Sequence, residues 1–243
     1  MKKTVALVAL LASNAVLAGH GVHWAYSGNE GPEYWGKLAQ EYSTCSTGKN
    51  QSPVNLTQEI KAELSPLTFN YQTTATEVEN NGHTVQVNFP AGSTLSLDGH
   101  VYTLKQFHFH TTSENTIDGK SFPLEGHLVH ADDKGNLAVV AVMFDQGAAN
   151  EALNPIWKAM PAKANQKSTL PQAISASGLL PADASYFRFN GSLTTPPCTE
   201  GVMWLVLKTP VTVSEEQVAQ FEKAVGGHNN RPLQPLNARA ILK

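Results

Sequence analysis

The chain has 243 residues, of which 41% are hydrophobic, and its 17 basic and 20 acidic side chains give a formal net charge of −3. This balance, with a sequence pI of about 6.3, excludes the strongly basic surface that binds nucleic acid or anionic membranes. We therefore expect no nucleic-acid partner, and the composition is that of an ordinary globular protein.

The first 18 residues have the pattern of a secretory signal peptide. Lys2 and Lys3 precede an apolar run over residues 4–12, and small residues at Val16 and Ala18 indicate a cleavage site. The apolar run is too short to cross a bilayer, so we expect no membrane insertion. We expect cleavage after Ala18 and one domain over residues 19–243, located in the periplasm or secreted. The alternative is an ordinary N-terminal helix.

The sequence contains two cysteines, Cys45 and Cys198. In an exported protein an even number of cysteines favours a disulfide. A bond between these two would close a long loop and stabilise the fold by up to roughly 5 kcal/mol in the chain-entropy model. The alternatives are two buried thiols that never meet, or a cysteine that binds a metal.

Strand-like patterning dominates the chain after residue 67, with Gly- and Asn-containing turn signals between the segments. Helical patterning is sparse, and the best candidates are residues 150–160 and 214–225. The second candidate begins with Ser214 and Gln217 in the spacing of a capping box. These patterns predict a single, mainly β domain with short peripheral helices. The predicted strands cover residues 69–71, 84–89, 94–97, 101–110, 124–130, 137–144 and 202–207.

Two of these predicted strands carry histidines with a spacing that suits a metal. Side chains alternate between the faces of a strand, so His108 and His110 share one face with Gln106. In the next strand His127 shares a face with Glu125. Three imidazoles with one open position are how a catalytic zinc is held, whereas structural zinc sites have four protein ligands. The pattern therefore predicts a zinc enzyme.

A series of short motifs also follows a fixed order along the chain. They are His23-Trp24-Ala25-Tyr26, Gly31-Pro32-Glu33-Tyr34-Trp35, Gln51-Ser52-Pro53-Val54-Asn55-Leu56, Asn80-Asn81-Gly82-His83, Gln106-Phe107-His108-Phe109-His110, Ser113-Glu114-Asn115, Glu125-Gly126-His127-Leu128-Val129-His130, Gly191-Ser192-Leu193-Thr194-Thr195-Pro196-Pro197-Cys198 and Asn230-Arg231-Pro232-Leu233-Gln234-Pro235-Leu236. In this order they resemble the α-class carbonic anhydrases of the exported bacterial type, over nearly all of residues 19–243. The resemblance implies a central, twisted, mostly antiparallel sheet of about ten strands, which agrees with the strand-rich pattern.

The resemblance implies that His108, His110 and His127 hold one Zn²⁺ per chain. Carbonic anhydrase is itself the standard example of zinc lowering the pKa of bound water to about 7. The resulting hydroxide attacks carbon dioxide, and water then displaces bicarbonate. Hydrolysis of activated esters is a side activity that the same hydroxide would support.

The resemblance also implies groups that orient the ligands and the substrate. Gln106 and Glu125 resemble residues that accept the second N–H of a ligand histidine, and a backbone carbonyl near Asn229 serves the third ligand. Thr194 resembles the residue whose hydroxyl accepts from the zinc-bound hydroxide, and Glu114 resembles the residue that takes the threonine proton. The backbone N–H of the same threonine would serve the developing bicarbonate oxygen.

Further positions are assigned to the substrate pocket and to proton transfer. Carbon dioxide is uncharged, so its pocket should be apolar. The proton must leave through a group that titrates near neutrality, and His83 resembles the family's shuttle. Gln86 departs from the asparagine common at its position, which leaves the solvent network and the shuttle's efficiency open. The pocket positions are Val129, Val139, Leu193, Thr195 and Trp204, and the solvent-network positions are Tyr26, Asn81 and Gln86.

Three other functions compete with this interpretation. A binding or adhesion module that resembles the family would lack one or more ligand histidines. A zinc-storage protein would favour histidine-rich tracts. A different zinc hydrolase would need another ligand cluster, which Thr111 and Thr112 after His110 do not provide. Exported bacterial relatives are often dimers, so the resemblance favours a homodimer. His130 lies three residues after His127 and would face away from the metal on a strand, so we predict a structural role for it.

Overall fold

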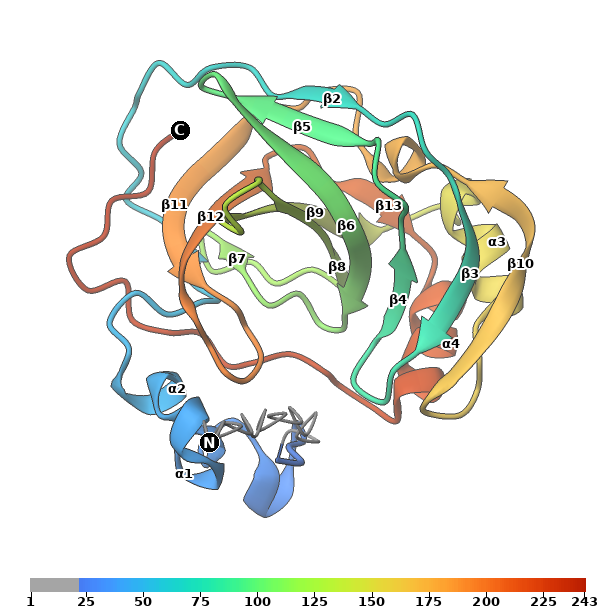
Figure 1. The fold of residues 1–243 in the computed structure, drawn as a ribbon, viewed down its shortest axis with the longest axis horizontal. Coiled ribbons are helices and arrows are strands. Elements are labelled where there is room, and N and C mark those ends of the chain that lie inside the picture. The colour runs from blue at the N-terminus through green and yellow to red at the C-terminus, as the bar shows by residue number, and fades with distance from the viewer. Residues whose placement is uncertain (1–21) are drawn as a thin grey trace, which may run out of the picture.

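A twisted, mixed sheet of eleven strands forms the centre of the computed structural model, which describes residues 22–243 (Figure 1). The predicted signal peptide over residues 1–18 lies outside the described residues. The strands are β1 (Asn55–Leu56), β2 (Thr68–Asn70), β3 (Ala75–Asn80), β4 (Val85–Asn88), β5 (Thr94–Leu97), β6 (His100–His110), β7 (Thr116–Ile117), β8 (Leu124–Ala131), β9 (Leu137–Gln146), β10 (Gln166–Ile174), β11 (Tyr186–Ser192), β12 (Glu200–Leu207) and β13 (Val211–Val213).

The large sheet follows the order β10-β3-β4-β6-β8-β9-β12-β11, with β13 paired to β9 and β5 linking β2 to β6. Within this sheet β9 pairs in parallel with β12 and β13, and the other pairs are antiparallel. A separate parallel pair joins β1 and β7. The mainly β, mostly antiparallel fold predicted from the sequence is therefore confirmed.

Four strands of the large sheet were not predicted from the sequence: β3, β10, β11 and the three-residue β13. β3 and β11 carry charged or small polar residues that break the apolar alternation. β10 contains Pro171, which argues against a strand because proline cannot donate to a ladder. The structure places β10 at the sheet edge, where proline is tolerated, and its pairing with β3 shifts register between Thr169 and Ile174.

The helices are short and lie at the periphery. The predicted helix over 214–225 is confirmed as α4, with Ser214 and Gln217 forming the capping box and Gly226 in the left-handed conformation that ends it. The predicted helix over 150–160 is divided, because Pro155 restarts the chain as a new helix after a 3₁₀ turn. The helices are α1 (Trp35–Leu38), α2 (Thr44–Thr47), α3 (Asn154–Ala159) and α4 (Glu215–Val225), and the 3₁₀ turns are η1 (Gly28–Glu30), η2 (Gln40–Tyr42), η3 (Glu151–Leu153) and η4 (Ala176–Leu179).

The sheet separates two apolar clusters. Phe107 and Phe109 of β6 are fully buried in the larger cluster, beneath α3 and α4. The Phe109 ring meets Trp157 of α3 and Phe221 of α4 edge to face, with ring centroids 5.2 and 6.1 Å apart. The opposite face of β6 carries the histidines and borders a second cluster around Trp204. The phenylalanines of the His-Phe-His motif thus anchor the strand from behind.

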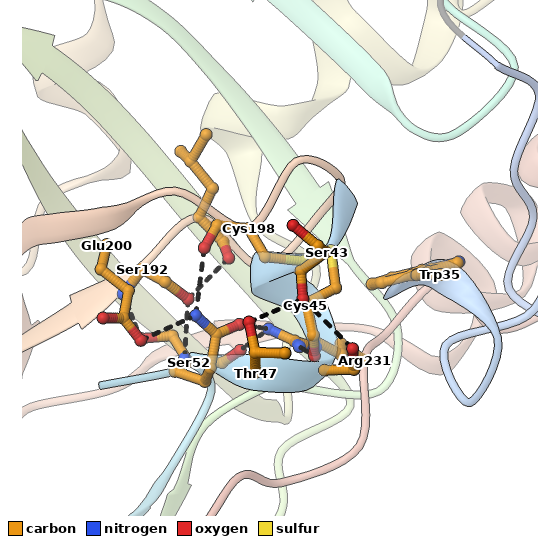
Figure 2. Close-up of a disulfide and its surroundings, with 12 residues drawn as sticks. Trp35, Ser43, Cys45, Thr47, Ser52, Ser192, Cys198, Glu200 and Arg231 are labelled. Carbon is orange, nitrogen blue, oxygen red and sulfur yellow. Dashed lines mark hydrogen bonds between the residues drawn. A yellow bond between two sulfur atoms is a disulfide. The ribbon is translucent and has the colours of Figure 1, made fainter. Parts of the chain in front are cut away.

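A disulfide joins Cys45 of α2 to Cys198 after β11, with their Cα atoms 5.0 Å apart, which confirms the predicted bond (Figure 2). The buried guanidinium of Arg231 donates to the backbone oxygens of Cys45 at 2.9 Å and Ser52 at 2.8 Å. It also lies 5.7 Å from the ring centroid of Trp35. This arginine therefore ties the N-terminal segment to the body of the protein.

No helix within residues 22–243 combines the length and apolar character needed to cross a membrane.

Candidate active site

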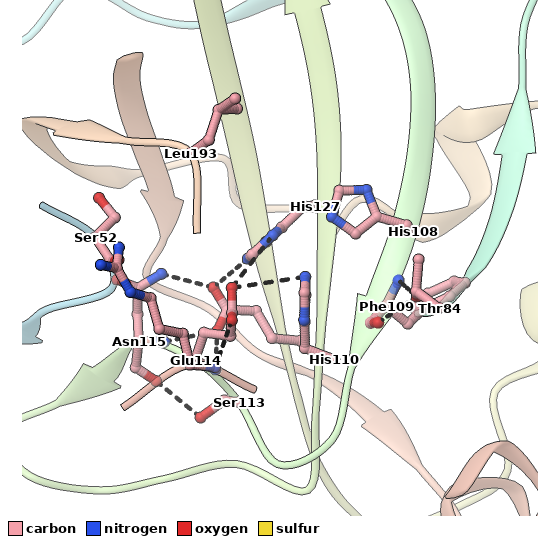
Figure 3. Close-up of polar contacts among 12 residues, drawn as sticks. Ser52, Thr84, His108, Phe109, His110, Ser113, Glu114, Asn115, His127 and Leu193 are labelled. Atoms are coloured by element: carbon pink, nitrogen blue, oxygen red, sulfur yellow. Dashed lines mark hydrogen bonds and ion pairs between the residues drawn. The ribbon is translucent and has the colours of Figure 1, made fainter. Parts of the chain in front are cut away.

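Three histidine rings converge on the face of β6 and β8 that points away from the two phenylalanines (Figure 3). His108 pairs directly with His127 in the β6–β8 register, and His110 follows two residues along β6. One ring nitrogen from each lies within 4.8 Å of those of the other two. The predicted ligand set is therefore brought together by strand alternation and register.

One nitrogen of each ring faces an oxygen acceptor. Carbonyl and carboxylate oxygens only accept, so the facing nitrogen carries the proton and the other nitrogen keeps a lone pair. The lone-pair atoms are Nε2 of His108, Nε2 of His110 and Nδ1 of His127. The contacts are His108 Nδ1 to Gln106 Oε1 at 2.8 Å, His110 Nδ1 to the Asn229 backbone oxygen at 2.7 Å, and His127 Nε2 to Glu125 Oε1 at 2.9 Å.

The three rings fit a zinc ion. Burial lowers the pKa of His108, His110 and His127, so all three remain in the neutral form that binds metals. Among the described residues, His110 Nε2 and Glu114 Oε2 are the buried side-chain polar atoms that lack a hydrogen-bond partner. An unsatisfied buried group costs about 1–3 kcal/mol, and a metal bond would remove that cost for His110.

Glu125 is a fully buried carboxyl that is surrounded by donors. Its Oε2 accepts from the backbone N–H groups of Glu114 at 2.7 Å and Asn115 at 2.8 Å, and its Oε1 accepts from Asn115 Nδ2 at 2.8 Å. Burial raises the pKa of Glu125, and these hydrogen bonds oppose the rise. The donors hold the carboxyl in place to orient His127.

Glu114 lies beside the histidines and is also buried. Its Oε1 accepts from the backbone N–H of Arg231 at 2.8 Å, and its Oε2 lies 3.6 Å from His110 Nε2 and 4.0 Å from His127 Nδ1. Burial raises the pKa of Glu114 to about 8, against the lowering effects of Arg231 and the Thr194 hydroxyl. Thr194 therefore lies close to Glu114, although Oε2 has no partner with hydrogen-bond geometry.

An apolar wall extends from the histidines across neighbouring strands. Val129 of β8 pairs with Val139 of β9, which in turn pairs with Trp204 of β12. The Trp204 ring meets His127 edge to face, with ring centroids 4.9 Å apart, and its N–H donates to the Ser192 backbone oxygen. Leu193 packs against the same cluster, and with Thr195 it stays half-buried.

His83 stacks flat on Trp24, with ring centroids 3.8 Å apart and planes 8° from parallel. The ring is half-buried, and burial followed by the charge of His23 lowers the pKa of His83. The backbone oxygen of His83 accepts from Asn229 Nδ2 at 3.0 Å, and the backbone oxygen of Asn229 orients His110. The Asn229 residue thus connects the His83 turn to a ligand histidine.

The predicted solvent-network residues contact groups around His83. Tyr26 packs edge to face on Trp24, and burial followed by the charge of Glu114 raises the pKa of Tyr26. Gln86 lies opposite His108 in the β4–β6 pairing and contacts the side chain of Asn81.

Asn115, Arg231 and the side chain of Asn229 carried no assigned role in the sequence, whereas the backbone carbonyl expected near Asn229 is that of Asn229 itself. Asn115 holds Glu125, Arg231 holds Glu114 through its backbone, and the Asn229 side chain donates to two backbone oxygens. Asn115 and Arg231 lie within the motifs that resemble the family. Their position in those motifs was the signal from which a supporting role could have been predicted.

Comparisons with known proteins agree with this geometry. Residues 30–243 match the family model described as eukaryotic-type carbonic anhydrase. A carbonic anhydrase from Neisseria gonorrhoeae is 51% identical over 98% of this chain and 95% of its own length. One from Pectobacterium carotovorum is also 51% identical, over 91% of each chain. The α-carbonic anhydrase of Thermovibrio ammonificans, solved with the inhibitor sulfanilamide, superimposes with a TM-score of 0.90 at 48% identity, over 92% of this chain and 100% of that one.

The fold, the three-histidine centre and these similarities place the chain in the α-class carbonic anhydrase family. It is an enzyme of the carbonic anhydrase type, with zinc as its cofactor and carbon dioxide and bicarbonate as its substrates.

Proposed function

We propose that this protein catalyses the reversible hydration of carbon dioxide to bicarbonate and a proton at one zinc ion held by His108, His110 and His127. The convergence of their three lone-pair nitrogens is the observation that carries the proposal. Bound there, zinc supplies a Lewis acid that makes water a nucleophile near neutral pH.

Thr194 and Glu114 orient the attacking oxygen in this proposal. A hydroxyl that donates its proton to a carboxylate has only lone pairs left for a second partner. Thr194 would therefore accept a hydrogen bond from the attacking oxygen and aim that oxygen's lone pair at carbon dioxide. The Thr194 N–H would stabilise charge on the bicarbonate oxygen as it develops. The hydrogen bond from the Arg231 backbone N–H to Glu114 and the proximity of Thr194, both of which lower the pKa of Glu114, support this role.

The apolar wall is the proposed site for carbon dioxide. The substrate is small and uncharged, so it gains by leaving water for an apolar surface next to the nucleophile. Val139 and Trp204 are buried in this wall, while Val129, Leu193 and Thr195 remain partly accessible. Activated esters that reach the same nucleophile would be hydrolysed as a side reaction.

His83 is the proposed proton shuttle. Imidazole titrates near neutrality and accepts or releases a proton at either ring nitrogen. The partial exposure of His83 and its position on Trp24 support an exchange with bulk solvent. Tyr26, Asn81 and Gln86 would orient the intervening water.

We also propose that residues 19–243 form the catalytic domain of an exported protein after cleavage near Ala18, and that the chain forms a homodimer. The disulfide between Cys45 and Cys198 supports an oxidising compartment. Size-exclusion chromatography with light scattering of the mature chain would test the dimer.

Stopped-flow measurement of proton release from carbon dioxide tests the proposed activity. We expect rapid turnover by the zinc-loaded protein and loss of at least a hundredfold in kcat/KM for His110→Ala, which removes a ligand. Equal rates for the two proteins would refute the proposal.

A further inference from the structure

Hydrogen bonds run in one direction from the His83 turn to Gln86. Asn81 Oδ1 accepts from the backbone N–H groups of His83 and Thr84, both at 2.9 Å. Because these protons occupy the oxygen end of the Asn81 amide, its nitrogen end faces Gln86 and donates to Gln86 Oε1 at 3.4 Å. The backbone of the turn thereby determines which end of Gln86 must face Asn81.

Glu79 holds the other end of the Gln86 amide. Gln86 Nε2 donates to Glu79 Oε1 at 3.1 Å and to Asn88 Oδ1 at 2.8 Å. Asn88 Nδ2 donates to the same Glu79 Oε1 at 3.0 Å, which fixes the Asn88 amide as well. A flipped Gln86 amide would place its oxygen against a carboxylate, and two acceptors repel each other. Lys167 Nζ, 3.3 Å from Glu79 Oε2, holds the carboxylate from the far side.

The same residues form a row that reaches the metal centre. Glu79 pairs with Gln86 between β3 and β4, and Gln86 pairs with His108 between β4 and β6. Directly opposed residues of antiparallel strands have their side chains on one face. The row therefore places Glu79 two strands away from a ligand histidine, with Gln86 between them.

We propose that Glu79 is a positioning residue for proton transfer, because it fixes Gln86 as a pure hydrogen-bond acceptor toward solvent. Both amide protons of Gln86 are used by Glu79 and Asn88, whereas its oxygen has a second lone pair beyond the contact with Asn81. Water in the proton path can only donate to Gln86, so its direction of hydrogen bonding is fixed. The inference rests on the proposed carbon dioxide hydration with export of its proton past Gln86, and it extends the solvent network to a side chain outside the known motifs.

A single substitution with a matched control tests this role. Glu79→Ala frees one N–H of Gln86, while Glu77→Ala removes an exposed carboxylate of the same strand. In zinc-loaded protein and weak buffer we expect Glu79→Ala to lower kcat about three- to tenfold, the factor that corresponds to one hydrogen bond. The value of kcat/KM should stay constant, because proton export limits kcat and not the conversion of carbon dioxide. Added imidazole should restore kcat, and Glu77→Ala should match the parent.

A double-mutant cycle identifies Gln86 as the intermediary. In a Gln86→Leu background, Glu79→Ala should change kcat no further, because the amide that it orients is gone. An equal loss of kcat in that background, a fall in kcat/KM, or identical behaviour of the Glu79 and Glu77 variants would overturn the inference. His83→Ala measured in parallel separates the two claims. A normal kcat for His83→Ala would refute the shuttle alone if Glu79→Ala still lowers kcat, and both claims would fail if neither variant changes it.

Discussion

The backbone N–H of Arg231 donates to Glu114 Oε1 at 2.8 Å, and the buried guanidinium of the same residue holds the segment around the disulfide. The carboxyl beside the metal centre is therefore positioned by a residue whose side chain is fixed from outside the centre. Glu114 keeps its second oxygen, Oε2, toward His110 and His127.

Replacing Glu114 by glutamine should separate orientation from metal binding. An amide can donate to the Thr194 hydroxyl, so the threonine no longer has to give its proton away and the attacking oxygen loses its fixed direction. We expect Glu114→Gln to lower kcat/KM by about a hundredfold, the cost of misplacing a reacting atom. Zinc content by atomic absorption should remain one ion per chain. Full activity of this variant would contradict the proposed role.

Removing His83 should slow only the export of the proton. We expect His83→Ala to lower kcat at least tenfold in weak buffer, because general acid–base groups contribute about 10²- to 10⁴-fold, and to leave kcat/KM unchanged. Imidazole should restore the rate because it can carry the proton in solution. Failure of imidazole to restore kcat would exclude His83 as the shuttle.

The disulfide should contribute strongly to stability. It joins residues 153 positions apart, so it removes many unfolded conformations. The double variant Cys45→Ser, Cys198→Ser should lose about 2–4 kcal/mol of unfolding free energy in urea denaturation. Intact mass should rise by two hydrogens on reduction of the parent. An unchanged mass would show that the bond does not form.

His130 should make the fold sensitive to acid. It is fully buried, its Nε2 lies 2.8 Å from the Tyr71 hydroxyl, and burial lowers the pKa of His130 to about 4. An unfolded histidine has a pKa near 6.5, so the unfolded chain binds the proton first and stability falls as the pH drops from 6.5 towards 4. Over that interval the loss amounts to about 3 kcal/mol.

A comparison of variants measures the contribution of His130 to the loss of stability in acid. His130→Gln should be less stable at pH 7 but lose about 3 kcal/mol less than the parent on acidification, as measured by urea denaturation at each pH. His100→Gln, at an exposed position, serves as the control and should follow the parent. Parallel pH curves for the parent and His130→Gln would contradict the account.

The centre of the site was predictable because its spacing is local. Alternation along a strand sets His108 and His110 on one face and the phenylalanines on the other, and it also brings Gln106 and Glu125 beside the histidines that they orient.

The supporting contacts were harder to predict, since they join segments far apart in the chain. Arg231 reaches Glu114 across 117 positions, and Asn229 reaches His83 across 146. The partner of Gln86 became evident only when the β3–β4 pairing placed Glu79 beside it. The strand that holds Glu79 lacks an apolar alternation, so its partner could not be read from the pattern.

Removal and return of zinc tests the central claim most directly. A chelator-stripped sample and the same sample reloaded with one equivalent of Zn²⁺ would be compared for carbon dioxide hydration by stopped flow. We expect activity to vanish on stripping and to return in proportion to bound zinc, up to one ion per chain. Hydration that persists in the stripped protein, or fails to return when one zinc per chain is bound, would contradict the account.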